Sequence, residues 1–210
     1  MMATHTLYYG KGRDVRTVLG ACRLAKCRYC AMFLTMSLVV GCSRTPVDEI
    51  AEKLEEPDHQ VRYDAVKELE DYGPGAIDAV PALADALSDP SPKVRYRSAK
   101  VLSKIGIGAS SAAEQIAASL KDEATDAETR YYLVKTLANI EDSAIVALDA
   151  LTEILQRDGD KKTRYYAAKA LGKLGSDAQS AIDALESAKR DSDAKLRKAA
   201  TEALAKVRPT

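Results

Sequence analysis

The side chains best suited to covalent or metal chemistry are gathered near the start of this chain of 210 residues. All four cysteines stand at or before position 42, namely Cys22, Cys27, Cys30 and Cys42. Cys27 and Cys30 have the two-residue gap of a metal or redox pair, but no second pair accompanies them. His59 is the one histidine after position 42. We therefore expect no metal site and no cofactor in the rest of the chain.

No constellation of catalytic residues can be assembled from positions 43–210. A nucleophile paired with a general base would have to use His59, the only histidine there. No glycine-rich phosphate loop follows a strand pattern, because no strand pattern is present. The carboxylates of Asp48, Glu49, Glu55 and Glu56 fit the solvated face of a helix better than an acid/base pair. We therefore expect that the protein is not an enzyme.

The composition indicates a folded, helical protein. Apolar residues make up 46% of the chain and charged residues 30%, whereas aromatic residues make up only 5%. The formal net charge is zero, but residues 1–41 hold six basic residues and one acidic residue, which leaves a charge of about −5 on residues 42–210. A mildly acidic body argues against binding to a nucleic-acid backbone.

Residues 23–42 have the order of a secretory signal. Basic residues precede an uncharged run from Ala31 to Val40. As a helix this run would rise about 15 Å, roughly half of what is needed to cross the core of a bilayer. A basic segment, a short apolar segment and then small residues are typical of an export signal. The alternative is a buried apolar helix with an incidental cysteine.

The end of the apolar run resembles the lipobox of bacterial lipoproteins. The matching residues are Leu38-Val39-Val40-Gly41-Cys42. The resemblance implies cleavage before Cys42, attachment of lipid to Cys42, and residence in the bacterial cell envelope on the periplasmic or outer-membrane side. It divides the chain into a leader at 1–41, a lipid-anchor cysteine with a short tether at 42–46, and a body at 47–208.

The body contains five tandem repeats. One arginine recurs at spacings of 33, 35, 34 and 33 residues: Arg62, Arg95, Arg130, Arg164 and Arg197. Four residues before each arginine stands a residue suited to capping a helix: Asp58, Ser91, Asp126, Asp160 and Asp193. Apolar residues follow helical spacing on both sides of these caps, so each repeat is predicted to be a pair of helices. Three repeats have a glycine positioned to end the second helix: Gly73, Gly106 and Gly175.

These repeats resemble the HEAT repeat, in the short bacterial form named phycobilisome-lyase-type HEAT-like repeats. The residues that carry the resemblance are Ala79-Val80-Pro81-Ala82-Leu83, Asp89, Val94-Arg95 and Ala168-Lys169-Ala170-Leu171-Gly172. The resemblance implies an all-α fold, a right-handed α-solenoid of about five HEAT-like helix pairs with the second helices lining the concave side. It does not imply lyase activity, because scaffolds and enzymes share the fold.

On a helical projection, the recurring arginines lie at the edge of the apolar face that each second helix is predicted to bury in the core. We expect a structural ladder in which each arginine bonds a capping aspartate or a backbone carbonyl of an adjacent repeat. The alternative is a ligand-binding role, but recurrence in every repeat favours structure.

Tyrosine and lysine recur on each of the first four second helices, outside the face that is predicted to be buried. The stripe consists of Tyr63, Lys67, Tyr96, Lys100, Tyr131, Lys135, Tyr165 and Lys169. Each tyrosine precedes its lysine by four residues, which places both on one helix face. Such a stripe suits an acidic or carboxylate-bearing peptide; the alternative is that the rings pack on the next repeat and the lysines are solvated. Lys198 and Glu202 interrupt the pattern, so we expect any groove to end near residue 170.

The sequence therefore predicts a membrane-anchored scaffold or adaptor that binds an unknown protein or peptide partner on the concave face. One alternative is a phycobilin-lyase-like or other HEAT-repeat enzyme. Another is a HEAT-type nucleic-acid binder, which the charge of the body and the leader both oppose.

Overall fold

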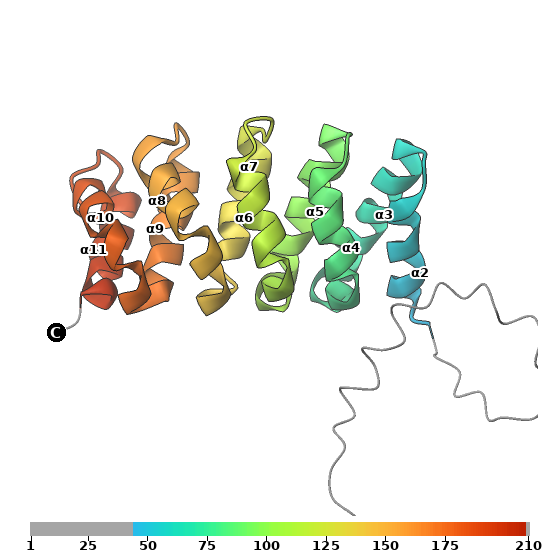
Figure 1. Cartoon of the computed structure of the whole chain (residues 1–210), viewed down its shortest axis with the longest axis horizontal. Coiled ribbons are helices and arrows are strands. Elements are labelled where there is room, and N and C mark those ends of the chain that lie inside the picture. The colour runs from blue at the N-terminus through green and yellow to red at the C-terminus, as the bar shows by residue number, and fades with distance from the viewer. Residues whose placement is uncertain (1–43, 209–210) are drawn as a thin grey trace, which may run out of the picture. The chain divides into compact units, whose positions relative to one another are not determined.

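Five helical hairpins follow one another along the chain in the computed structural model, which describes residues 44–208 (Figure 1). The chain divides into two compact units, residues 1–42 and 43–210, and the described residues fall in the second. The predicted leader and the anchor Cys42 lie outside the described residues. Within residues 44–208 there is no strand, and the predicted all-α solenoid of about five helix pairs is confirmed.

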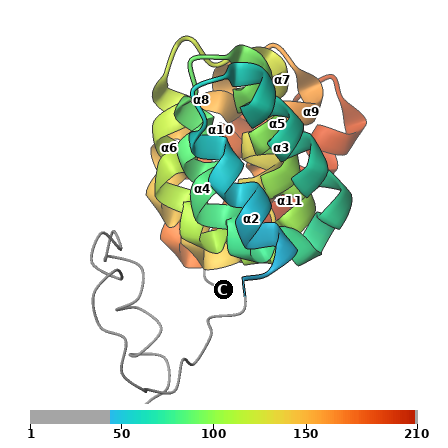
Figure 2. The same cartoon turned by 90° about the vertical axis from the view of Figure 1, so that its right-hand side faces the viewer.

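Each repeat pairs a short first helix with a longer second helix. The first helices are α2 (Pro46–Glu52), α4 (Val80–Asp85), α6 (Ala113–Lys121), α8 (Leu148–Arg157) and α10 (Ile182–Ala188). The second helices are α3 (His59–Tyr72), α5 (Pro92–Ile105), α7 (Ala127–Leu137), α9 (Lys161–Leu174) and α11 (Ala194–Val207). Seen along the stack, the first and second helices form two layers (Figure 2).

Short 3-10 segments link or extend these helices: η1 (Lys53–Glu55), η2 (Gly73–Ala79), η3 (Ala86–Ser88), η4 (Gly106–Ala112), η5 (Glu141–Ala147) and η6 (Gly175–Ala181). Because η2, η4, η5 and η6 connect each second helix to the next first helix, they lie along one edge of the stack, which we call the turn edge. The loops between the first and second helices of each repeat form the opposite edge, which we call the loop edge (Figure 1).

The second helices begin at side-chain caps in four of the five repeats. Asp58, Asp126, Asp160 and Asp193 each accept a hydrogen bond from a backbone amide in the first turn of α3, α7, α9 or α11. Ser91 differs, because its side chain makes no capping bond to α5. Instead Pro92 occupies the first helical position, where a missing amide costs nothing.

The core is built from leucine, isoleucine and valine side chains of both helices of each repeat, together with many alanines. Leu69, Leu102, Leu137 and Leu171 are fully buried. The alanines let neighbouring helices approach closely, most of all where α9 meets α11: a Cβ on Gly172 would lie 2.8 Å from the Cα of Ala203. These buried residues form one hydrophobic cluster within residues 44–208.

Three second helices end at a glycine whose φ is positive, with φ values of 51°, 69° and 56° at Gly73, Gly106 and Gly175. Their ψ values lie between −126° and −132°, in a region open to glycine rather than in the left-handed helical region predicted from sequence. After the second helix of the third repeat, Glu141 begins the corresponding turn with a φ of 54°. No described helix is both long enough and apolar enough to cross a membrane.

Candidate binding face on the second helices

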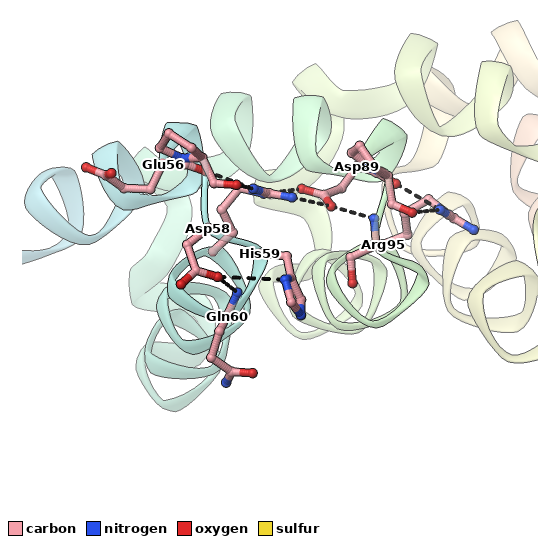
Figure 3. Close-up of polar contacts among 10 residues, drawn as sticks. Glu56, Asp58, His59, Gln60, Asp89 and Arg95 are labelled. Carbon is pink, nitrogen blue, oxygen red and sulfur yellow. Dashed lines mark hydrogen bonds and ion pairs between the residues drawn. The ribbon is translucent and has the colours of Figure 1, made fainter.

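Three of the five recurring arginines bind aspartates that precede the caps. Arg62 donates from Nε to Asp89 Oδ2 at 2.6 Å and from Nη2 to Asp89 Oδ1 at 3.0 Å. Asp89 belongs to the next repeat and also accepts the backbone amide of Ser91 (Figure 3). Burial raises the pKa of Asp89. The hydrogen bonds from Arg62 and from the Ser91 amide lower the pKa by more than burial raises it, so the pKa lies below its ordinary value.

Two further pairs repeat this contact between repeats: Arg130 donates to Asp158 at 2.7 Å and Arg164 donates to Asp191. We call these three pairs the arginine ladder. The carboxylate partner is thus the aspartate two residues before the cap, and not the capping residue expected from the sequence. The caps are already occupied by backbone amides, whereas the preceding aspartates face the previous repeat.

The ladder is interrupted after Arg95. Its guanidinium donates to the carbonyls of Asp89 and Pro90 in its own loop, at 2.8 and 3.2 Å (Figure 3). Arg197, in the last repeat, likewise bonds two carbonyls of its own loop. The position where a partner for Arg95 is expected, two residues before the cap Asp126, is occupied by Ala124. The carbonyl bonds are therefore made within a repeat and not between repeats as we expected.

Five tyrosine rings form a continuous chain across three second helices, which we call the tyrosine ladder. Its members, in spatial order, are Tyr96, Tyr132, Tyr131, Tyr166 and Tyr165, from α5, α7 and α9. Successive ring centroids lie 5.6, 5.0, 5.7 and 5.2 Å apart in edge-to-face geometry. All five rings are half-buried, so they pack on one another and still expose part of their surface.

The phenols inside the ladder are hard to ionise. Burial raises the pKa of Tyr131, and the neighbouring Tyr166 hydroxyl raises it further. Burial likewise raises the pKa of Tyr132, together with the nearby Tyr96 hydroxyl. These rings are therefore neutral hydrogen-bonding groups at physiological pH.

The first tyrosine of the predicted stripe lies outside the ladder. The guanidinium carbon of Arg97 lies 4.7 Å from the centroid of the Tyr63 ring, and its Nη2 donates to the Tyr63 hydroxyl at 2.7 Å. Arg97 also donates to Glu70 at 2.6 Å. The Tyr63 ring is therefore occupied by a cation from the same chain.

Glu70 collects three cations at this N-terminal part of the face. Besides Arg97, the ammonium groups of Lys100 and Lys104 each lie 2.9 Å from Glu70 Oε1, and the Glu70 side chain is only 10% exposed. Burial raises the pKa of Glu70, but the hydrogen bonds and charges of Lys104 and Lys100 outweigh this effect and lower the pKa to about 2. The charge of Lys100, one member of the predicted stripe, is therefore neutralised by Glu70 of the same chain.

The lysines of the next two repeats have no such partner. Lys135 Nζ lies 5.9 Å from the centroid of the Tyr132 ring, and Lys169 Nζ lies 5.7 Å from the centroids of both Tyr165 and Tyr166. Neither lysine has a carboxylate within 4.0 Å among residues 44–208. Their charges remain available on the face that carries the tyrosine ladder.

A groove of about 1250 Å³ opens beside this cationic part of the face, between α9 and α11. Its lining combines ladder rings with lysines, among them Tyr131, Tyr165, Tyr166, Lys161, Lys162 and Lys195. The groove continues to Glu202, so the expectation that it ends near residue 170 is wrong. The last repeat departs from the Tyr/Lys pattern, but small Ala194 and Ala199 leave space there while Lys195 keeps the charge positive.

Two of the three carboxylates in the groove accept hydrogen bonds that cap the helices α9 and α11. Asp160 accepts both the amide and the hydroxyl of Thr163, and Asp193 accepts the amide of Leu196. Glu202 lies 3.8 Å from Lys198. Within the described part of the chain, Lys161, Lys162 and Lys195 have no carboxylate within 4.0 Å. With Lys198 the groove lining holds four lysines against three carboxylates, so its formal charge is about +1.

Sequence reasoning missed Tyr132, Tyr166, Arg97 and Glu70. The two tyrosines directly follow stripe tyrosines, so the Tyr-Tyr doublets were the available signal. Glu70 and Arg97 occur in single repeats and therefore escape an alignment of repeats. In residues 44–208 there is no cluster of His, Cys, Asp and Glu that could hold a metal ion.

These features define a helical solenoid of tandem repeats with an aromatic and cationic groove on its second helices. A family model described as HEAT repeats matches residues 47–126 and 113–205. The chain therefore belongs to the HEAT-repeat family. No curated protein matches it.

Several solved structures share the fold. An engineered protein aligns with a TM-score of 0.66 and 24% identity over 78% of this chain and 80% of that one. A designed armadillo repeat protein in complex with a (KR)4 peptide aligns with a TM-score of 0.67 and 18% identity over 76% and 80%. The complex of CpcE and CpcF of phycocyanin lyase from Nostoc sp. aligns with a TM-score of 0.60 and 22% identity over 84% and 70%. At these identities the likeness concerns the fold, and it carries no argument for lyase chemistry.

Proposed function

We propose that this protein is a membrane-anchored scaffold, and not an enzyme, which binds an acidic segment of a partner protein on its second-helix face. The observation that carries the proposal is the tyrosine ladder with Lys135 and Lys169 beside it, both without a carboxylate partner among the described residues. Half-buried aromatic rings supply contact area at low entropic cost, and cations without partners need not break an existing ion pair to bind a carboxylate.

The two ends of the face differ in their readiness to bind. In the N-terminal repeats Arg97 already covers the Tyr63 ring, and Glu70 already holds Lys100. An incoming carboxylate would have to displace Glu70, which has a pKa of about 2 and competes strongly for these cations. The open surface therefore runs from α7 to α11, along the groove of about 1250 Å³.

The charge of the groove selects the partner. A designed armadillo repeat protein of similar fold is known in complex with the basic peptide (KR)4. The groove of the present chain has the opposite requirement, because Lys161, Lys162 and Lys195 line it without carboxylate partners among the described residues. Complementarity of charge then favours a peptide rich in aspartate or glutamate.

Binding is tested with two labelled peptides of equal length, one rich in glutamate and one rich in lysine, titrated against the purified protein and followed by fluorescence anisotropy. We expect binding of the acidic peptide, weakened as salt concentration rises. Tyr166→Ala should weaken this binding several-fold, whereas Tyr72→Ala, which removes an exposed ring outside the ladder, should not. A Tyr166→Ala variant with a lower melting temperature and unaltered affinity would show that the ring only packs.

The anchoring part of the proposal rests on Cys42 and its neighbours. Only three residues, at 43–45, separate Cys42 from the first helical residue Pro46, so a lipid on Cys42 would hold the first repeat within roughly 10–15 Å of the membrane. Mass spectrometry of the protein from the membrane fraction tests this directly. Lipid on an N-terminal Cys42 is expected, and an intact N-terminus or an unmodified Cys42 would contradict the anchor.

A further inference from the structure

The large apolar side chains that remain exposed in residues 44–208 are unevenly distributed. There are six of them, and five lie at or beside the turn edge: Tyr72, Ile77, Ile107, Ile145 and Val146. The sixth, Val61, lies in the first turn of α3. Ile107 is the most exposed, at 62%. Scattered exposed apolar residues need no explanation, but a row of them along one edge marks an interaction surface.

Exposed apolar side chains occur in three successive turns, η2, η4 and η5, and are absent from the fourth described turn. Ile77 in η2 reaches the next turn, because a Cβ on Gly108 of η4 would lie 2.8 Å from Ile77 Cδ1. Ile145 and Val146 continue the row in η5. The last turn, η6, has polar residues instead: Ser176, Asp177, Gln179 and Ser180. The apolar row is therefore confined to the turns nearest the N-terminal end of the solenoid.

The described chain also begins at this edge. Helix α2 runs antiparallel to α3, so the capping residue Thr45 lies at the same edge as η2, as Figures 1 and 2 both show for the start of α2. Cys42 is three residues from Thr45 and so lies no more than about 11 Å from it in a fully extended chain. An anchor on Cys42 would therefore bring the apolar row, and not the loop edge, to the membrane.

We propose that the turn edge formed by η2, η4 and η5 rests on the bilayer, with Ile77, Ile107 and Ile145 in contact with the lipid interface. The inference rests on the proposed lipid anchor for its orientation. Four or five apolar side chains give weak binding on their own, but a short tether raises their effective concentration at the surface so that weak contacts suffice. The loop edge, with its arginine ladder, then points away from the membrane.

The charges around the row select the type of lipid. Asp78, Glu141 and Asp142 are exposed on these turns, and Lys173 lies 3.8 Å from Glu141. An edge with more acidic than basic groups is repelled by anionic headgroups. The matching surface is therefore one of zwitterionic lipid, into which the aliphatic side chains insert while the carboxylates stay in the water layer.

The absence of tryptophan from the sequence provides a direct test, since one introduced tryptophan reports on its own position. Residues 42–210 contain a single cysteine, Cys42, which can be coupled to a maleimide lipid in zwitterionic vesicles. Three single-tryptophan variants are compared: Ile107→Trp in the row, Ser176→Trp at the equivalent position of η6, and Lys93→Trp at the loop edge. Circular dichroism melts serve as the control that each variant is folded.

We expect the emission of Ile107→Trp to shift to shorter wavelength on vesicles and to be quenched by brominated acyl chains. The Ser176→Trp and Lys93→Trp variants should stay accessible to aqueous iodide. A tryptophan at 107 that remains as accessible to iodide as that at 93 would overturn the inference. So would a shift that needs no vesicles and grows with protein concentration, because the row would then join two copies of the chain. Chemical coupling makes this result independent of lipidation in the cell, which mass spectrometry decides separately.

Discussion

Arg62 of the first repeat binds Asp89 of the second through two adjacent nitrogen atoms: Nε lies 2.6 Å from Oδ2 and Nη2 lies 3.0 Å from Oδ1. The same Asp89 Oδ1 accepts the backbone amide of Ser91, the residue directly before α5. One carboxylate thus joins two repeats and shapes the loop that starts the next helix.

Replacement of Asp89 should therefore lower stability in two separable steps. Asp89→Asn keeps an oxygen for the Ser91 amide but removes the charge opposite Arg62, whereas Asp89→Ala removes both contacts. We expect the melting temperature to fall by a few degrees for Asp89→Asn and further for Asp89→Ala. Asp85→Ala, at an exposed position of α4, is the control. Equal melting temperatures for Asp89→Ala and the control would show that the arginine ladder contributes nothing.

Glu70 should make stability dependent on pH in the acid range. Its pKa in the folded protein, about 2, lies below the ordinary value, so its contribution is complete above about pH 4.5 and is lost as the pH falls toward 2. Glu70→Gln should lower the free energy of unfolding by on the order of 2 kcal/mol at neutral pH. This difference should close near pH 2, where the carboxyl of the parent is protonated.

Urea denaturation of the parent and of Glu70→Gln at pH 7 and near pH 2 measures the effect. Glu68→Gln, whose side chain is half exposed and 3.7 Å from Lys53, is the matched control and should change stability little at either pH. A difference between the parent and Glu70→Gln that stays constant over the whole pH range would contradict the role given to Glu70.

The close contact of α9 with α11 should not tolerate a side chain at Gly172. A Cβ there would lie 2.8 Å from both Cα and Cβ of Ala203, so Gly172→Ala should cost about 1–3 kcal/mol despite the better helix propensity of alanine. Ala203→Gly added to this variant should restore part of the loss. Gly159→Ala has free space around it and should be nearly neutral. Chemical denaturation that finds Gly172→Ala as stable as the parent would refute the close packing.

The turn before α8 offers a stabilising substitution. Glu141 has a φ of 54° where three other repeats have glycine, a backbone conformation that costs a residue with a Cβ roughly 1 kcal/mol. Glu141→Gly should therefore raise the melting temperature, while Glu141→Ala, which keeps the Cβ, should not. The comparison is informative because both variants lose the same weak contact with Lys173. A larger gain for the alanine variant would contradict this explanation.

Repetition determined what could be predicted from the sequence. The buried leucines, the caps and the ends of the second helices occupy the same position in several repeats, so helical periodicity was sufficient to find them. The ladder aspartates Asp89, Asp158 and Asp191 also recur. Their role as arginine partners was nevertheless assigned to the capping residues two positions later. Glu70 and Arg97 could not be found in this way, because each depends on a partner present in one repeat only.

The central claim is that the groove lysines without a carboxylate partner among residues 44–208 select an acidic partner. The direct measurement compares a triple variant of the groove, Lys161→Glu with Lys162→Glu and Lys195→Glu, with a control that makes the same charge change at exposed Lys53, Lys121 and Lys206. In anisotropy titrations the groove variant should lose about tenfold or more in affinity for the glutamate-rich peptide and gain affinity for the lysine-rich one. The control variant should keep the preference of the parent. Equal losses in both variants, or an unchanged preference in the groove variant, would contradict the account.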